Sequence, residues 1–385
     1  MGEKTSEITT EVRGQVGCIT LNRPRALNAL TLGMVRGLMA TLLAWQGDAQ
    51  VLAVAIRGSN KEGPFGAFCA GGDIRFLYQA GSQGDPQVED FFTEEYALNH
   101  LIHHYLKPCI AFMDGIVMGG GMGISQGASL RVVTERTRMA MPETAIGMFP
   151  DVGGGYFLSR CPGHVGEWLA LSGETITAGD AVASALADGC VPVSALEGLW
   201  QALGQQHFAN AQQVQQLVAA KFTAASADRL CAKAEIDHYF ALPTVAAIVG
   251  ALEASDSPWA QATAATLRKR SPLMLHVVLE QVRRARSMDL ADDLRMERAM
   301  VRHCFHLRPG RSETLEGIRA LAVDKDHAPQ WQPARIEEVS DAMVAPFFDS
   351  PWPAHAHPLA ALEDNTASEK PTQSRLALAG LQTVC

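Results

Sequence analysis

The chain has 385 residues, of which 47% are apolar and 19% are charged. At about 150 residues per domain, this length predicts one large domain or two to three smaller ones, with enough apolar residues for a sizeable core. The 41 acidic and 32 basic residues leave a formal net charge of −9, and no run rich in lysine and arginine occurs. This composition argues against a mainly disordered chain, a nucleic-acid partner and a basic membrane-binding surface.

Eight cysteines are scattered along the chain without a CxxC pair. In a chain of this size, that distribution predicts reduced thiols in a reducing compartment and not a disulfide scaffold. The segment 1–14 is polar with mixed charges, unlike a secretory signal or an arginine-rich transit peptide. No stretch of about 18 uninterrupted apolar residues occurs, as a membrane-spanning helix would require. We therefore expect a soluble, cytoplasmic protein.

Short apolar runs alternate with helical patterns in the first half of the chain. Strands are predicted at residues 16–21, 51–57, 109–114 and 130–134. Helices are predicted at residues 28–45, with Thr31 as the N-cap, at 74–80 and at about 87–105. Residues 58–73 and 141–155 lack a regular period and are predicted to be loops. This alternation predicts an α/β region with a largely parallel sheet.

Helical patterns dominate after about Gly163. They cover residues 164–172, 178–188, 195–207, 212–223, 243–254, 259–270, 272–286, 290–305 and 313–322. After residue 345 the composition shifts to proline, histidine and alanine, followed by a polar stretch. The sequence thus predicts three regions: an α/β core at 1–163, a helical C-terminal region at 164–345 and a loosely packed C-terminal tail at 346–385.

Several short motifs give weak functional signals. Neither GxGxxG nor GxxxxGK[S/T] occurs, so nucleotide-binding loops of those kinds have no support. His100, His103 and His104 share one predicted helix, but without an HExxH motif we predict helix packing or solvent exposure and no metal site. The GISQG motif at 123–127 matches the GxSxG turn of serine hydrolases. The preceding strand ends about ten residues too early for that turn, so Ser125 is the weaker candidate for a nucleophile.

Three other segments form a stronger candidate site. AFCAGGDI at 67–74 and GGGMG at 119–123 are turns of small residues that precede predicted helices, where backbone N–H groups are exposed. Two such N–H groups that converge on one oxygen form an oxyanion hole, although either cluster alone is also typical of a tight turn. The third segment, 141–155, places Glu143 and Asp151 among apolar and small residues. Desolvation there raises the pKa of a carboxyl group and makes it a better base, although each acid could instead cap a helix.

In this order, the three segments resemble the enoyl-CoA hydratase/isomerase (crotonase) superfamily. The run PETAIGMFPDVGGGYFL at 142–158 is similar to the thioesterase branch that acts on 3-hydroxyisobutyryl-CoA in valine breakdown. The resemblance covers about residues 12–339, although residues 196–270 carry no motif that supports it. It implies an α/β fold, a crotonase-like spiral of repeated ββα units, with a helical C-terminal region.

The resemblance also implies roles for individual residues. The amides of Gly72 and Gly120 correspond to the family's oxyanion hole, and Glu143 and Asp151 to its catalytic carboxylates. Glu95, from the FFTEEYALN segment, corresponds to a carboxylate that lines the substrate pocket together with Gly120, Glu143 and Asp151. Coenzyme A is part of the implied substrate, so no separate cofactor, metal, nucleic acid or membrane partner is expected. Homo-oligomerisation stays open.

The implied reaction is hydrolysis of a short β-hydroxyacyl-CoA thioester, with Glu143 as the base that activates water or as the nucleophile. Two alternatives remain: hydration of a short-chain enoyl-CoA, and acyl-CoA binding without catalysis. Hydratases of the superfamily carry a second glutamate two residues after the GGG turn, and that position is Gly123 here. Hydration needs two acid–base groups, so the sequence favours hydrolysis.

Overall fold

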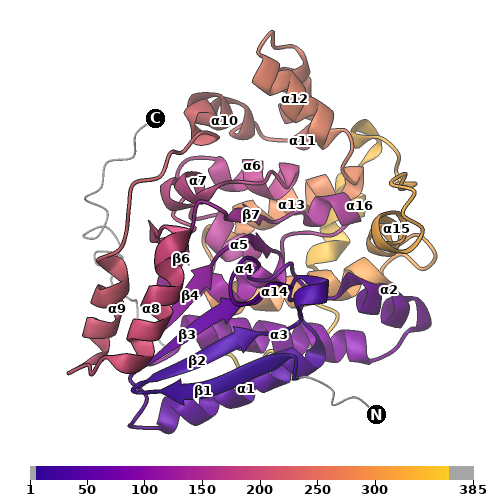
Figure 1. Cartoon of the computed structure of the whole chain (residues 1–385). Helices are drawn as coiled ribbons and strands as arrows, with labels where there is room; N and C mark the ends of the chain where they lie inside the picture. Colours follow the sequence, from indigo (N-terminus) through magenta and orange to yellow (C-terminus); the bar gives the residue numbers. More distant parts are fainter. Residues whose placement is uncertain (1–5, 364–385) are drawn as a thin grey trace.

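The computed structural model describes residues 6–363 of the chain. Its strands are β1 (Ile8–Arg13), β2 (Val16–Leu21), β3 (Ala53–Gly58), β4 (Cys109–Met113), β5 (Ile116–Met118), β6 (Leu130–Val133), β7 (Arg138–Ala140) and β8 (Gly189–Cys190). The main sheet has the order β1-β2-β3-β4-β6-β8, and β5 pairs with β7 in a second sheet. Strands β1, β2, β3, β4 and β6 lie side by side in Figure 1. The β1–β2 pair is antiparallel and the other pairs are parallel. The predicted α/β region with a largely parallel sheet is confirmed.

Helices form in most of the segments where the sequence predicts them. In the first half they are α1 (Leu32–Gly47), α2 (Ile74–Gln83), α3 (Gln87–His103), α4 (Gly120–Gln126) and α5 (Gly154–Leu158). The remainder are α6 (Val165–Ser172), α7 (Ala178–Ala183), α8 (Val193–Gln205), α9 (Ala211–Ala219), α10 (Lys233–Phe240), α11 (Val245–Glu253), α12 (Pro258–Leu267), α13 (Pro272–Ala285), α14 (Leu290–His306), α15 (Glu313–Ile318) and α16 (Asp341–Val344). A π-helical turn (Arg319–Val323) extends α15, and a 3₁₀ turn (Glu143–Ile146) lies in the predicted loop 141–155.

The first helix shows how a side chain sets a boundary. It begins at Leu32 and not at residue 28, because Thr31 Oγ1 accepts a hydrogen bond from the Met34 N–H at 3.1 Å. A threonine with extended backbone that accepts such a bond is an N-cap, and the residues before it lie outside the helix. The predicted cap is therefore confirmed, and the predicted start was wrong.

Helices cover both faces of the main sheet (Figure 1). In β3, Val54 and Ile56 join a large apolar cluster with residues of α1 and α3. Ala53 and Ala55 join a smaller cluster on the other face with residues of α8 and α9. Successive side chains of a strand point to opposite faces, so a strand covered on both sides is apolar at every position. This explains the continuous apolar run that predicted β3.

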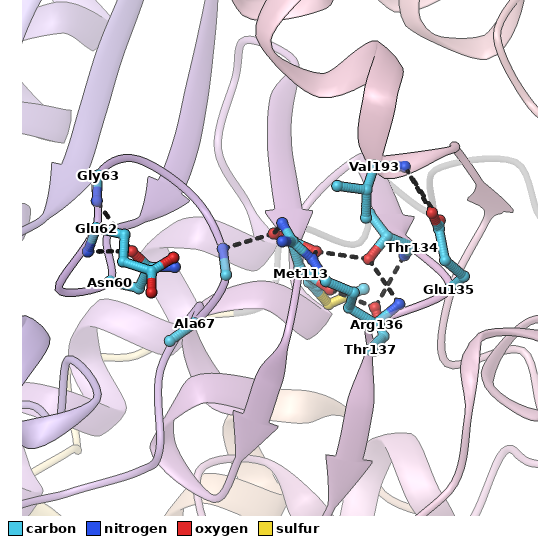
Figure 2. Close-up of polar contacts among 12 residues, drawn as sticks. Asn60, Glu62, Gly63, Ala67, Met113, Thr134, Glu135, Arg136, Thr137 and Val193 are labelled. Atoms are coloured by element: carbon cyan, nitrogen blue, oxygen red, sulfur yellow. Dashed lines mark hydrogen bonds and ion pairs between the residues drawn. The ribbon is translucent and has the colours of Figure 1, made fainter.

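A polar network ties the ends of β4 and β6 to the loop that follows β3 (Figure 2). The buried carboxylate of Asp114 accepts hydrogen bonds from Thr134 Oγ1 and from the Gly66 N–H, both at 2.6 Å. Arg136 forms an ion pair with the same carboxylate. A buried carboxylate with several donors is stably held. The network therefore anchors the loop 58–73, whose far end carries Gly72.

In its described part, the C-terminal tail is mostly exposed and contacts the rest of the chain at a few points. Phe347 is buried, and the side chain of Arg295 on α14 donates hydrogen bonds to the carbonyls of Leu359 and Leu362. These hydrogen bonds hold the end of the described tail against α14. Residues 364–385 of the tail lie outside the described residues.

One apolar cluster extends from Ile19 in β2 to Leu359 in the tail and crosses the boundary predicted at Gly163. The division into regions at 163 and 345 stays a prediction. Within residues 6–363, no helix combines the length and apolarity that crossing a membrane requires.

Candidate active site

The two glycine turns lie directly against each other. Gly72 precedes α2, and Gly120 is the first residue of α4. A β-carbon placed on Gly120 would lie 3.4 Å from the Gly72 nitrogen, and one placed on Gly71 would lie 3.7 Å from the Gly120 nitrogen. Within residues 6–363, neither the Gly72 nor the Gly120 N–H donates a hydrogen bond. Both amides are therefore available to one bound acceptor atom.

Glu143 lies beside the second turn and is 7% exposed. Its Oε1 is 2.8 Å from the position of a β-carbon on Gly119, and its Oε2 has no hydrogen-bond partner among the described residues. Burial raises the pKa of Glu143 well above its usual value, and the charge of Asp151 raises it further. A carboxylate with a raised pKa is a stronger base once it is ionised.

Asp151 is 6% exposed and accepts a hydrogen bond from the Tyr96 hydroxyl at 2.9 Å. Burial raises the pKa of Asp151 to about 7, while the hydrogen bond from Tyr96 acts in the opposite direction. The charge of this carboxyl group therefore changes near neutral pH. The sequence motifs did not single out Tyr96, although it is the neighbour of Glu95 in the same segment.

Helix α3 contributes two further polar side chains to the site. Glu95 is 2% exposed, and its Oε1 lies 2.5 Å from the position of a β-carbon on Gly120. Burial raises the pKa of Glu95, and the charges of Asp151 and Glu143 add to that effect. Asn99, one helical turn further on, is 3% exposed.

Asn99 was missed by the sequence analysis. Its Nδ2 lies 3.1 Å from the position of a β-carbon on Gly123. Neither polar atom of its amide, nor Oε1 of Glu95, has a hydrogen-bond partner among residues 6–363. Buried polar groups are almost always hydrogen-bonded in native proteins, so these atoms are free to bind a ligand or water. The i, i+4 spacing from Glu95 is the signal that could have identified Asn99.

The other candidate motifs do not join the site. The Ser125 hydroxyl is buried in α4 and donates a hydrogen bond to the Gly121 carbonyl at 2.8 Å, as a helical serine commonly does. The ring of His104 packs against those of His100 and His103, with centroid distances of 4.4 and 4.9 Å respectively. In the described part of the chain, no group of three or more His, Cys, Asp or Glu residues is placed to hold a metal ion.

The family model described as "Enoyl-CoA hydratase/isomerase" matches residues 16–348. A relative from Xenopus tropicalis, named "3-hydroxyisobutyryl-CoA hydrolase, mitochondrial", is 38% identical over 353 residues, 90% of this chain and 90% of the relative. The relative of the same name from Danio rerio is 39% identical over 351 residues, with the same coverage of both chains.

Two crystal structures are similar along most of the chain. One, named a carnitinyl-CoA dehydratase from Mycobacterium thermoresistibile, has a TM-score of 0.82 and 39% identity, and the match covers 89% of this chain and 96% of that chain. The other, named an enoyl-CoA hydratase from Rhodobacter sphaeroides 2.4.1, has a TM-score of 0.80 and 38% identity, with 89% and 97% covered. These likenesses confirm the predicted crotonase-like fold with its helical C-terminal region.

Removing the Tyr96 hydroxyl should raise the pKa of Asp151. A hydrogen bond to a carboxylate stabilises its charged form, so Tyr96→Phe should shift the titration of Asp151 upward from about 7. Carbon-13 NMR of labelled aspartate carboxyl groups measures this shift, with Asp151→Asn to assign the signal. The control is Tyr105→Phe, which removes a hydroxyl that donates to the Leu42 carbonyl. An unchanged or lower pKa in Tyr96→Phe would contradict the geometry.

Proposed function

The chain belongs to the enoyl-CoA hydratase/isomerase family, and on that premise we propose that it hydrolyses the thioester of 3-hydroxyisobutyryl-CoA to the free acid and coenzyme A. Relatives that carry this activity in their names match about 90% of the chain. One observation carries the proposal: two unpartnered backbone amides lie beside buried carboxylates. Thioester hydrolysis needs these two elements, namely a site for the developing oxyanion and a group that activates the nucleophile.

The two glycine amides would bind the thioester oxygen. As a nucleophile attacks the carbonyl carbon, negative charge develops on that oxygen, and the N–H groups of Gly72 and Gly120 stabilise it. The loss of one such donor typically costs about 3–4 kcal/mol, or about 10²–10³ in rate. Because both donors belong to the backbone of packed turns, they need no rearrangement during the reaction.

Glu143 would activate the nucleophile in one of two ways. As a base, it takes a proton from a water molecule, whose oxygen attacks the thioester carbon while the C–S bond breaks and coenzyme A leaves as the thiol. As a nucleophile, its carboxylate attacks the thioester carbon, the C–S bond breaks, coenzyme A leaves, and water then hydrolyses the mixed anhydride that remains. Label found in Glu143 after a single turnover in ¹⁸O-labelled water identifies the second route, because only attack of water on the Glu143 carbonyl of the anhydride places it there.

Asp151 would act beside Glu143. Its charge raises the pKa of Glu143, and its carboxylate would orient the water or the substrate hydroxyl. Because the pKa of Asp151 is about 7, its charge is lost as the pH falls through that value. We therefore expect kcat to fall below about pH 7.

Enoyl-CoA hydration is the second candidate, because the two similar crystal structures are named as a dehydratase and a hydratase. The surroundings of Gly123 disfavour it. A β-carbon there would lie 2.6 Å from Val152 Cβ and 3.1 Å from Asn99 Nδ2, so a glutamate does not fit without displacing its neighbours. The second acid–base group that the resemblance implies for hydratases is therefore absent and has no space at this position.

The preference for hydrolysis is directly measurable. Release of thiol from 3-hydroxyisobutyryl-CoA should exceed hydration of crotonyl-CoA by at least about 10² in kcat/KM, roughly the value of one acid–base group. A chromogenic thiol reagent follows the first reaction, and loss of enoyl absorbance follows the second. Efficient hydration with little thiol release would favour the hydratase. Neither reaction, with acyl-CoA binding intact, would indicate a binding protein.

Glu143→Gln should abolish most turnover without loss of the fold. The amide keeps the shape of the side chain but can neither accept the proton nor attack, so kcat should fall by about 10²–10⁴. Ser125→Ala is the control, because its hydroxyl only bonds to its own helix and its loss should leave kcat nearly unchanged. If Glu143→Gln kept more than a tenth of the wild-type rate, Glu143 would be neither base nor nucleophile.

The cellular setting is also part of the proposal. A role in valine breakdown follows from the substrate, and coenzyme A enters as part of it, so the reaction uses no separate cofactor. The curated relatives are named as mitochondrial proteins, whereas the sequence predicts a cytoplasmic location for this chain. Fractionation of cells that express the full chain tests that prediction.

A further inference from the structure

The turn that follows Asp151 has a strained backbone. Val152 adopts φ of +58° and Gly153 adopts φ of +85°. The left-handed region suits glycine, but a β-branched residue such as valine rarely enters it because its side chain collides with the backbone. Such a conformation persists only where surrounding contacts impose it, and it is often found at functional sites.

Two buried side chains from the C-terminal helices impose it here. Glu297 on α14 accepts hydrogen bonds from the Gly153 N–H at 2.8 Å and from the Gly155 N–H at 2.9 Å. Gln281 on α13 donates to Glu297 Oε1 at 2.9 Å and to the Pro150 carbonyl at 2.6 Å. Both side chains are completely buried. Together they hold the chain on each side of the strained turn.

A second acid on α14 also binds the backbone that follows the strained turn. Asp293, one helical turn before Glu297, accepts a hydrogen bond from the Tyr156 N–H at 2.9 Å. A β-carbon on Gly155 would lie 2.4 Å from Asp293 Oδ1, so the start of α5 lies directly on α14. One helix of the C-terminal region therefore holds the segment 150–156 at three amide groups, those of Gly153, Gly155 and Tyr156.

The opposite side of the turn faces the site already described. Val152 lies against α4, where its Cβ is 2.6 Å from the position of a β-carbon on Gly123. The neighbouring Asp151 accepts the hydrogen bond from Tyr96 on α3. The direction of the Asp151 carboxylate thus depends on the backbone conformation of Val152, and that conformation depends on contacts to α13 and α14.

We propose that Glu297 and Gln281 are positioning residues for Asp151. They hold Val152 in its left-handed conformation and so direct the Asp151 carboxylate toward Tyr96 and Glu143. This inference rests on the proposed function for its kinetic consequences only. It assigns to the helical C-terminal region a part of the active site that no catalytic motif indicates.

Glu297→Gln tests the inference. The amide keeps the size of the side chain, but its nitrogen faces a backbone N–H and cannot accept from it, so one of the two bonds to the turn is lost. We expect kcat for thiol release to fall at least about tenfold, with KM within about threefold of the wild type. We also expect the pKa near 7 in the pH profile of kcat to rise, because Asp151 loses its hydrogen bond from Tyr96. Removal of the Glu297 charge without movement of Asp151 would instead lower that pKa.

The matched control is Glu167→Gln. Glu167 is also a buried carboxylate, but it pairs with His164 and Arg286 and does not touch the turn. Its loss should lower the stability of the fold and leave kcat and the pH profile of the folded enzyme unchanged. If Glu297→Gln behaves like this control, Glu297 is only structural and the inference is overturned.

Two further measurements keep the test decisive. If Glu297→Gln does not fold, Gln281→Met removes the donor to the Pro150 carbonyl at similar volume and should give the same kinetic signature. If the wild type releases no thiol, the proposed function fails, and the inference is read from the NMR titration of Asp151 in the ligand-free protein. Glu297→Gln should shift that titration to higher pH, and Glu167→Gln should leave it in place. An unshifted or lowered titration in Glu297→Gln would overturn the inference independently of activity.

Discussion

Two backbone turns approach each other in this fold because neither carries a side chain at the point of contact. A β-carbon on Gly120 would lie 2.5 Å from Glu95 Oε1, closer than real atoms permit, and one on Gly119 would lie 2.8 Å from Glu143 Oε1. The glycines therefore allow two acids to approach the start of α4 while its first N–H groups stay uncovered. The candidate chemistry depends on this contact, because it places donors for an oxyanion next to buried bases.

The same contact has a cost in stability, because it requires several carboxyl groups to be buried close together. Burial raises the pKa values of Glu95, Glu143 and Asp151, and their mutual repulsion raises those of Glu95 and Glu143 further. Buried groups of this kind destabilise a fold unless the surrounding structure holds them. Here the apolar cluster that joins both halves of the chain supplies the stability, and hydrogen bonds from α13 and α14 hold the turn after Asp151. The helical C-terminal region is thus part of the site's construction.

The sequence predicted the features that local patterns encode. The apolar runs of β2, β3, β4 and β6 and the cap at Thr31 have a direct local signature, and the structure contains them. It missed β1, which is mostly exposed and polar, and β5, β7 and β8, which have at most three residues and no readable period. The resemblance drawn from the motifs identified Gly72, Gly120, Glu95, Glu143 and Asp151, which the structure brings together.

What the sequence could not provide are partners distant along the chain. Glu297 lies 144 residues after Gly153, and nothing in the α14 sequence distinguishes its carboxylate from that of the exposed Asp292 on the same helix. The left-handed conformation of Val152 likewise follows from tertiary contacts and contradicts the preference of a β-branched residue. Such local conflicts with intrinsic preference are expected where a fold serves a function.

The proposed chemistry requires the amides of Gly72 and Gly120 to converge on one oxygen of the substrate. A crystal structure of the Glu143→Gln variant with intact 3-hydroxyisobutyryl-CoA tests it most directly, because that variant should bind the thioester and not turn it over. The thioester oxygen should lie about 2.7–3.2 Å from both amide nitrogens, with its carbonyl carbon facing residue 143. A thioester oxygen bonded to other donors, with one or both of these amides left unpaired, would contradict it.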